Sequence, residues 1–168
     1  MTLPPVPLVS RGVGEVAFAE SLPAAVVALF ELLTHLGNPY LLLTCVAVAY
    51  LFGDRVGVSR RGAAFALGLG LCAIGLVLGL KQLFGLPRPP ISPRSGLGFP
   101  SGHALGSTAF WGGVAVLADR GRWRRRLTVA GVVIVVVAAS RVLIGVHYLA
   151  DVVAGVGIGV ALLAVTLW

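Results

Sequence analysis

Long apolar stretches separated by short polar segments run along most of the chain. A bilayer core of about 30 Å takes about 20 apolar residues of α-helix to cross. Four stretches meet this requirement, at about 62–83, 103–119, 127–146 and 150–168, and a shorter fifth one covers about 38–53. The pattern predicts an all-α, polytopic transmembrane helical bundle with five spans.

The stretch 22–36, just before the shortest span, has a different pattern. Its polar residues recur at helical spacing and form a stripe along one side: Glu31, Thr34, His35 and Asn38. An amphipathic helix of this kind lies in the membrane interface. We therefore predict an N-terminal interfacial helix whose polar stripe faces water. The alternative is a sixth span over about 16–36 that ends at the turn Gly37-Asn38-Pro39.

The composition agrees with this pattern and removes other classes of protein. Hydrophobic residues make up 58% of the 168 residues and charged residues 11%, with a mean hydropathy of +0.99. A soluble domain has about 45–50% apolar and about 25% charged residues. These values exclude a disordered chain, a collagen-like repeat and an ordinary soluble domain. The net charge of +7 would suggest a nucleic-acid partner in a soluble protein, so its placement decides its meaning.

Two loops hold most of the basic residues and predict the orientation of the chain. Loop 54–61 carries three arginines and loop 119–126 carries five: Arg55, Arg60, Arg61, Arg120, Arg122, Arg124, Arg125 and Arg126. Two spans separate these loops, so both lie on one side of the membrane, and the positive-inside rule makes that side cytoplasmic. Loops 84–102 and 147–149 then lie on the extracytoplasmic side. We therefore expect an integral protein of the cell membrane with no nucleic-acid partner.

Two pairs of glycines lie four residues apart inside predicted spans. Gly75 pairs with Gly79, and Gly155 pairs with Gly159. Small residues at this spacing let two helices approach closely in lipid. Because the chain has 23 glycines, such pairs also arise from abundance alone, and the sequence leaves both interpretations open.

A second set of polar residues does not belong to the topology signal. Ionisable residues in or beside membrane spans are costly and mark candidate functional sites. Those of this set fall at the extracytoplasmic ends of the predicted spans: Lys81, Arg88, Arg94, His103, Arg141, His147 and Asp151. Three separate segments of the chain thus bring lysine, arginine, two histidines and an aspartate to one depth on one side of the membrane.

The cations and one helix start predict a binding site for phosphate. Arginine grips phosphate oxygens with two N–H groups, and lysine adds a point charge. The sequence Pro100-Ser101-Gly102 leads into a predicted helix, whose free backbone N–H groups point at an approaching anion. Asp151 is the only acidic residue of the set, so there is no carboxylate cluster to hold Mg²⁺. We expect neither a metal nor another cofactor.

Two histidines supply the candidate chemistry. His147 and Asp151 are four residues apart, so the carboxylate can hold one ring nitrogen while the other stays free to attack. His103 can act as the general acid for the leaving oxygen. Arg141, six residues before His147, can hold the same phosphoryl group.

Together these residues form three motifs that resemble the phosphatase signature of the PAP2 (type 2 phosphatidic acid phosphatase) family in order and spacing. The motifs are Lys81-x6-Arg88-Pro89, Pro100-Ser101-Gly102-His103 and Ser140-Arg141-x5-His147-x3-Asp151. The superfamily also contains soluble acid phosphatases and vanadium haloperoxidases, and this chain is similar in hydropathy to the integral membrane branch. We expect one membrane domain over 1–168, with an N-terminal interfacial segment at 1–37 and a transmembrane core at 38–168. The family usually has six spans, one more than the pattern predicts.

The resemblance also implies a role for each matched residue. His147 is implied to be the nucleophile that forms a phosphohistidine, Asp151 to orient it, and His103 to protonate the leaving group and later help activate water. The implied phosphate ligands are Lys81, Arg88, Ser101, Gly102 and Arg141. The supporting positions are Pro89, Arg94, Pro100 and Ser140.

The sequence thus predicts a membrane lipid-phosphate phosphatase that works without a metal. Its substrate would be a lipid phosphomonoester or pyrophosphate at the extracytoplasmic surface, with phosphatidic acid, phosphatidylglycerol phosphate and polyprenyl pyrophosphate as candidates. One alternative is a lipid phosphotransferase that uses the same site. Another is a non-enzymatic transporter or scaffold, against which the placement of the charges at span ends argues. The expected partners are the lipid substrate and the bilayer, and the oligomeric state stays open.

Overall fold

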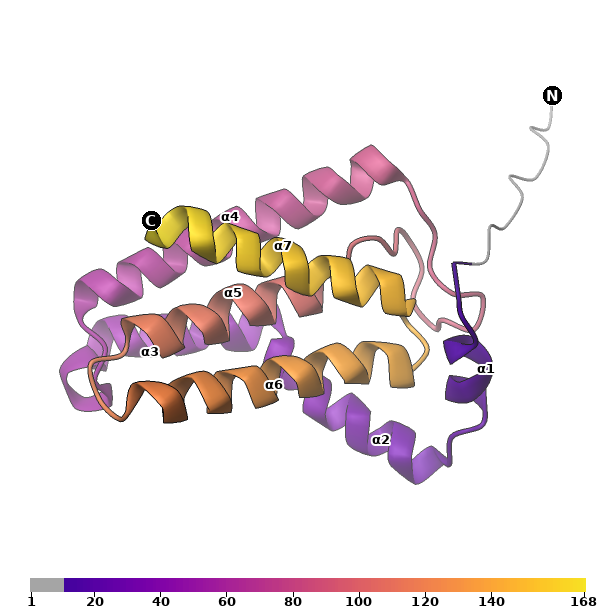
Figure 1. The fold of residues 1–168 in the computed structure, drawn as a ribbon, viewed down its shortest axis with the longest axis horizontal. Helices are drawn as coiled ribbons and strands as arrows, with labels where there is room; N and C mark the ends of the chain where they lie inside the picture. The colour runs from indigo at the N-terminus through magenta and orange to yellow at the C-terminus, as the bar shows by residue number, and fades with distance from the viewer. Residues whose placement is uncertain (1–10) are drawn as a thin grey trace.

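The structure, a computed structural model, describes residues 11–168 as a bundle of helices (Figure 1). In chain order they are α1 (Glu15–Glu20), α2 (Ala24–Leu33), the 3-10 helix η1 (Thr34–Gly37), α3 (Pro39–Val56), α4 (Arg60–Phe84), α5 (Gly102–Leu117), α6 (Trp123–Leu143) and α7 (Leu149–Leu167). The predicted all-α membrane bundle is confirmed. The predicted segment 1–37 is described only from residue 11 onward, and residues 1–10 lie outside the described part.

Helix α5 lies in the middle of the bundle and packs against α4, α6 and α7 (Figure 1). Its sequence suits this place because small residues recur along it, and Ala104, Ala109 and Ala115 are all buried. A cluster of apolar side chains, including Leu69 of α4 and Leu105 of α5, joins these two helices. The packing fixes the start of α5, which carries the second motif, against the rest of the bundle.

Helices α5 and α7 approach closely at one of the two predicted glycine pairs. A Cβ atom at Gly155 would lie 2.7 Å from the Ser101 carbonyl oxygen, and one at Gly159 would lie 2.7 Å from the Thr108 Cβ. Of the two interpretations that the sequence leaves open, close helix contact therefore holds for this pair. The other pair makes no such contact in the described residues, since a Cβ at position 75 or 79 would meet nothing within 4 Å.

The outer surface of the bundle is strongly apolar. Three helices, α4, α6 and α7, are long and apolar enough to cross a membrane. A fourth candidate is the pair formed by α2–η1 and α3, which are bent by 43° relative to each other and would count together as one span. Side chains such as Leu78, Val135 and Val153 are more than half exposed, as expected for contact with lipid. The count of five spans, with six as the alternative, stays a prediction.

The segment predicted as one amphipathic helix over 22–36 is broken near its end. Helix α2 stops at Leu33, and the next four residues form η1. A 3-10 helix turns every three residues instead of every 3.6, so the polar stripe does not continue on one side. Glu31 and His35 are exposed, as predicted, but Thr34 is buried. The expectation that Thr34 faces water is therefore wrong.

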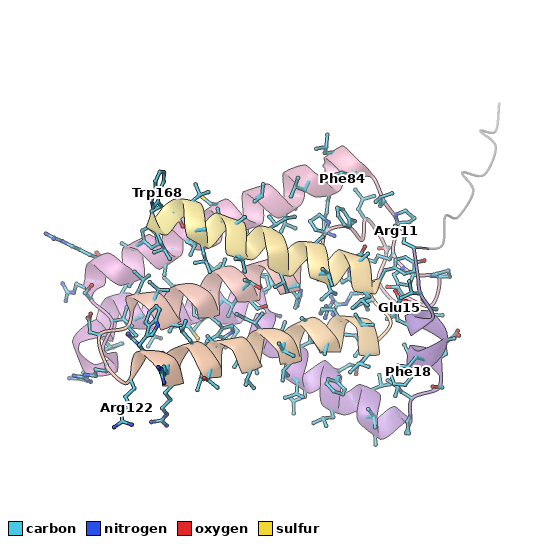
Figure 2. All side chains as sticks on the ribbon, in the orientation of Figure 1. Arg11, Glu15, Phe18, Phe84, Arg122 and Trp168 are labelled. Carbon is cyan, nitrogen blue, oxygen red and sulfur yellow. The ribbon has the colours of Figure 1, made fainter. Side chains whose placement is uncertain are left out.

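The two ends of the bundle differ in charge, as the loops predict. At one end the two basic loops lie side by side, because the Asp119 backbone N–H donates to the Gly57 carbonyl at 3.0 Å and Arg120 Nη1 donates to the Arg55 carbonyl at 2.8 Å. At the other end the α4–α5 loop, the α6–α7 junction and α1 come together (Figure 1). Figure 2 shows Arg11, Glu15 and Phe84 at this second end and Arg122 and Trp168 at the first.

Candidate active site

The three motifs meet at the end of the bundle that carries α1. They lie on the last turn of α4 and the loop after it, on the start of α5, and on the last turn of α6 with the start of α7 (Figure 1). Among the predicted catalytic and phosphate-binding residues, four are buried: Ser101, Arg141, His147 and Asp151. The other four are partly buried, namely Lys81, Arg88, Gly102 and His103, whereas the supporting residue Arg94 is exposed. The fold thus gathers the predicted residues at one place.

His147 and Asp151 form the contact expected from their spacing. His147 Nδ1 lies 3.2 Å from Asp151 Oδ2. The same oxygen accepts the Tyr148 backbone N–H at 3.1 Å, which caps the start of α7. Asp151 is fully buried and is the third residue of α7, from which its side chain reaches back to His147 just before the helix.

The partner of the second ring nitrogen of His147 determines the tautomer of the imidazole. Arg88 Nη1 lies 3.1 Å from His147 Nε2 and also donates to the Val146 carbonyl at 3.0 Å. A guanidinium group can only donate, so Nε2 accepts and carries a lone pair. The proton of the neutral ring is then on Nδ1, which donates to Asp151. This tautomer leaves Nε2 as a nucleophile that faces a cation.

His147 keeps this neutral state over a wide pH range. Burial lowers the pKa of its imidazole from 6.5 to about 4. The positive charges of Arg88 and Arg141 act in the same direction, while the hydrogen bond to Asp151 raises the pKa by less. The free imidazole needed for attack is therefore present at neutral and mildly acidic pH.

Two arginines surround the site with donors that have no acceptor. The Nε atoms of Arg88 and Arg141 are buried and lack a hydrogen-bond partner among the described residues. Arg141 is only 1% exposed, and its Nη1 donates to Thr34 Oγ1 at 2.8 Å. Buried polar groups are nearly always paired, and an unpaired one calls for an explanation. A bound anion with several oxygens would supply the missing acceptors.

Lys81 holds the loop between α4 and α5 in place. Its ammonium group donates to the carbonyls of Leu97, at 2.5 Å, and Gly98, at 3.2 Å. The loop passes very close to the site, since a Cβ atom at Gly98 would lie 2.8 Å from the Pro87 carbonyl oxygen and 3.2 Å from Asp151 Oδ2. Lys81 thus lies in the site, with its hydrogen bonds directed to backbone carbonyls.

The second motif forms the start of α5 as predicted. Ser101 is the N-cap, and its Oγ accepts the Ala104 backbone N–H at 3.5 Å. The Ser101 N–H donates to the Asp151 carbonyl at 2.9 Å, which ties this helix start to α7. His103 follows in the first turn, where the positive charges of Arg141, Arg94 and Arg88 act on it.

The residues predicted to have supporting roles lie around the site. Pro89 and Pro100 are buried in the loop. Ser140 is buried as well, and its hydroxyl donates to the Val137 carbonyl of its own helix at 2.6 Å. The exposed Arg94 has its backbone N–H bonded to Ser92 Oγ at 3.2 Å.

The structure adds residues that the motifs do not contain. Arg11 Nη1 donates to Asp151 Oδ1 at 2.5 Å, Thr34 accepts from Arg141, and Glu15 accepts the Leu149 N–H at 3.0 Å. More than 100 positions separate the members of each pair along the chain, so no local spacing indicates them. The sequence does contain one signal, because Arg11 is the one basic residue that belongs neither to the basic loops nor to the predicted site residues.

An apolar groove of about 220 Å³ leads to the site from the side of the bundle. It lies between α3, α4 and α5, and His103 is one of its few polar residues. Its lining includes Leu42, Val46, Gly70, Ile74, Val77, Leu78, Gly106 and Phe110. A hydrocarbon chain could lie along this surface while a polar group reached His103.

The donor set of the site favours an anion over a cation. Within residues 11–168, no group of three or more His, Cys, Asp or Glu side chains lies where it could hold a metal ion. The charged groups around His147 are mainly lysine and arginine, which bind phosphoryl oxygens directly.

Comparisons with known proteins agree with the fold and the motifs. The sequence profile of the PAP2 superfamily matches residues 62–168, a range that includes all three motifs. A transmembrane PAP2-type phosphatidylglycerolphosphate phosphatase from Bacillus subtilis is similar in structure, with a TM-score of 0.81 and 23% identity over 91% of this chain and 82% of that one. LpxE from Aquifex aeolicus has a TM-score of 0.74 and 20% identity over 91% of this chain and 92% of that one. No curated protein sequence matches.

Proposed function

The chain belongs to the PAP2 superfamily, and from this premise and the geometry of the site we propose that it is a membrane lipid-phosphate phosphatase. One observation carries the proposal. The neutral imidazole of His147 presents Nε2 to a guanidinium group, beside buried arginine donors that lack acceptors. A phosphoryl group bound there would satisfy the donors and place its phosphorus atom in reach of the nucleophile.

In the first step His147 attacks the phosphorus atom. The phosphoryl group takes the place of Arg88 Nη1 at His147 Nε2, and the N–H groups of Arg88 and Arg141 turn to its oxygens. The Nε2–P bond forms while the bond from phosphorus to the leaving oxygen breaks, and protonated His103 gives its proton to that oxygen. Asp151 stabilises the positive charge that develops on His147.

In the second step water releases the phosphate. Neutral His103 takes a proton from the water as its oxygen attacks phosphorus, and the P–N bond breaks. Inorganic phosphate leaves, His147 returns to its neutral form with the proton on Nδ1, and His103 is protonated again. No step calls for a metal, because arginine side chains hold the charge on the phosphoryl oxygens.

The groove supports a lipid as the substrate. It is almost entirely apolar and has His103 among its lining residues, so an acyl or isoprenoid chain would lie between α3, α4 and α5 with its phosphate at the site. The candidates are phosphatidic acid, phosphatidylglycerol phosphate and polyprenyl pyrophosphate. The name of the Bacillus subtilis neighbour refers to the second of these. By the positive-inside rule the site would lie on the extracytoplasmic side of the cell membrane.

An activity panel tests the proposal. The purified protein in detergent would be given each of the three lipid phosphates, with Mg²⁺ and with EDTA, and phosphate release would be measured for the wild type and for His147→Ala. We expect release from at least one lipid, unchanged by EDTA and lost in the variant. A strict requirement for Mg²⁺, or equal rates for both proteins, would refute the proposed chemistry. An added alcohol that receives the phosphoryl group would reveal a phosphotransferase instead.

A further inference from the structure

The segment from Arg11 to Glu15 lies against the start of α7 and the loop after α4. Both terminal nitrogens of the Arg11 guanidinium group donate hydrogen bonds, Nη1 to Asp151 Oδ1 and Nη2 to the Pro87 carbonyl. Its Cζ atom lies 4.9 Å from the ring centre of Tyr148, a cation–π contact. The side chain is only 15% exposed. Figure 2 shows Arg11 and Glu15 together at this end of the bundle.

Glu15, at the other end of the same segment, also forms hydrogen bonds that hold the segment in place. One carboxylate oxygen accepts the N–H of Leu149, the first residue of α7, at 3.0 Å, and the other accepts the Val13 N–H at 2.6 Å. Burial raises the pKa of this carboxyl group, but hydrogen bonds from backbone N–H groups outweigh it and the net shift is downward. Glu15 therefore stays ionised and fixes the segment that carries Arg11 against the start of α7.

The contacts of Asp151 show what Arg11 contributes. Its Oδ2 accepts from His147 Nδ1 and from the Tyr148 backbone, and its Oδ1 accepts from Arg11. A fully buried carboxylate without a cation nearby is costly in free energy. A carboxylate with one oxygen that lacks a hydrogen-bond partner can also rotate about its Cβ–Cγ bond. Arg11 compensates the charge and fixes the plane of the carboxylate.

We propose that Arg11 is a positioning residue for the reaction, which holds Asp151 in the plane that keeps the proton of His147 on Nδ1. Arg11 acts through Asp151 and does not touch the phosphoryl group. The inference rests on the proposed function, because its effect on rate requires His147 to be the nucleophile. None of the three motifs contains Arg11.

The charged groups around His147 give the direction of the expected pH effect. They come from every element packed against it: Lys81 of α4, Arg88 and Arg94 of the loop, His103 of α5, Arg141 of α6, Asp151 of α7, and Arg11 and Glu15 of the N-terminal segment. Removing one positive charge from such a set makes protonation of His147 easier. The acidic limb of the pH profile should then move to higher pH.

Kinetics of three variants test the inference. Arg11→Gln removes the charge and Arg11→Lys keeps it. Arg61→Gln makes the same change at an exposed position on the far end of α4. We expect Arg11→Gln to lower kcat/KM at neutral pH roughly tenfold, by analogy with the loss of an outer-shell partner of a metal-ligating histidine, and to move the acidic limb upward. Arg11→Lys should restore the position of the limb, and Arg61→Gln should match the wild type.

A measurement on the resting protein separates this inference from the proposed function. The chain has three histidines, so ¹⁵N-labelled imidazoles can be assigned and titrated by NMR in micelles without substrate. We expect His147 to carry its proton on Nδ1 in the wild type and to titrate at higher pH in Arg11→Gln. A wild type without phosphatase activity would refute the proposed function while leaving this arm able to test the inference.

A different pattern in Arg11→Gln would contradict the positioning role. If Arg11→Gln lowers kcat/KM by the same factor at every pH and leaves the tautomer and titration of His147 unchanged, Arg11 only secures the N-terminal segment, and the positioning role is wrong. Thermal unfolding of each variant confirms that it is folded before either comparison. Should Arg11→Gln fail to fold, Arg11→Met, which also removes the charge at a similar length, takes its place in the NMR titration. A higher titration pH for His147 then supports the role, and wild-type values oppose it.

Discussion

A single imidazole, that of His147, is held by two groups of opposite charge that give its nitrogens different tasks. Asp151 accepts from Nδ1, and Arg88 donates to Nε2. Because a guanidinium group only donates and a carboxylate only accepts, exchanging the two partners would move the proton to Nε2 and the lone pair to Nδ1. The choice of residue type at positions 88 and 151 therefore decides which nitrogen can attack.

The lowered pKa of His147 leads to a prediction about pH. Its imidazole becomes protonated only near pH 4, not near the ordinary 6.5, so the nucleophile is lost only in acid. We expect the acidic limb of kcat/KM, which reports the free enzyme, to have a midpoint near 4. The measurement is kcat/KM for a lipid phosphate between pH 3.5 and 8, corrected for the separately measured ionisation of the substrate. A midpoint near 6.5 would mean that His147 is not the titrating nucleophile in this environment.

At the residue scale, the sequence predicts the contacts that local spacing produces. Asp151 is only four residues after His147, in the first turn of α7, from which its side chain reaches back to the residue before the N-cap Tyr148. The partner of Arg141 does not follow, because Thr34 is 107 positions away and reaches the interior only where α2 ends early. The same holds for Arg11, whose partner lies 140 positions away.

At the element scale, the contact between α5 and α7 depends on two glycines of α7. At Gly155 and Gly159 the backbone and side chains of α5 come so close that a methyl group would overlap them. The contact also holds the site, since Ser101, at the start of α5, bonds to Asp151.

Substitution of these glycines gives a matched pair of variants. Gly155→Ala would place a methyl group 2.7 Å from the Ser101 carbonyl oxygen, and overpacking of this kind costs about 1–3 kcal/mol. Gly79→Ala meets nothing within 4 Å and should be neutral or slightly stabilising, because alanine favours a helix. Thermal unfolding in detergent should show a lower Tm and a lower activity for Gly155→Ala alone. Equal values for both variants would show that α5 and α7 do not pack as described.

The prediction of elements succeeds where the apolar pattern is long. The stretches predicted at 62–83 and 150–168 agree with α4 and α7 to within a few residues. The prediction fails at 34–37, where the chain forms a 3-10 turn and Trp111 Nε1 donates to the Leu36 carbonyl at 3.0 Å. That hydrogen bond joins residues 75 positions apart, so the pattern along 22–36 carries no sign of it.

On the scale of the whole molecule, three regions of the bundle lie in different places. Basic loops occupy one end, the candidate site occupies the other, and an apolar groove reaches the site from the side. A lipid would then enter from the membrane while phosphate leaves from the end of the bundle. This arrangement predicts that blocking the groove affects lipids and spares small soluble esters.

Gly106→Leu tests the role of the groove. Gly106 lines it, and a Cβ atom there meets nothing within 4 Å, so a larger side chain would fill space without a backbone clash. Displacing two methylene groups of a bound chain costs about 0.8 kcal/mol each, or about tenfold in KM. We expect this rise for a long-chain lipid phosphate and little change for a water-soluble phosphate ester. Gly131→Leu, on α6 away from the groove and also without a neighbour within 4 Å, is the control; equal KM changes in both variants would exclude the groove as the lipid site.

The central claim, attack of His147 on a lipid phosphate, is tested most directly by trapping the intermediate. The protein would be mixed with a ³²P-labelled lipid phosphate and quenched within one turnover. We predict a label on the protein that is stable in alkali, labile in acid and mapped to His147. His147→Ala should carry no label and release no phosphate. Phosphate release at the wild-type rate by His147→Ala, or a label on another residue, would contradict the account.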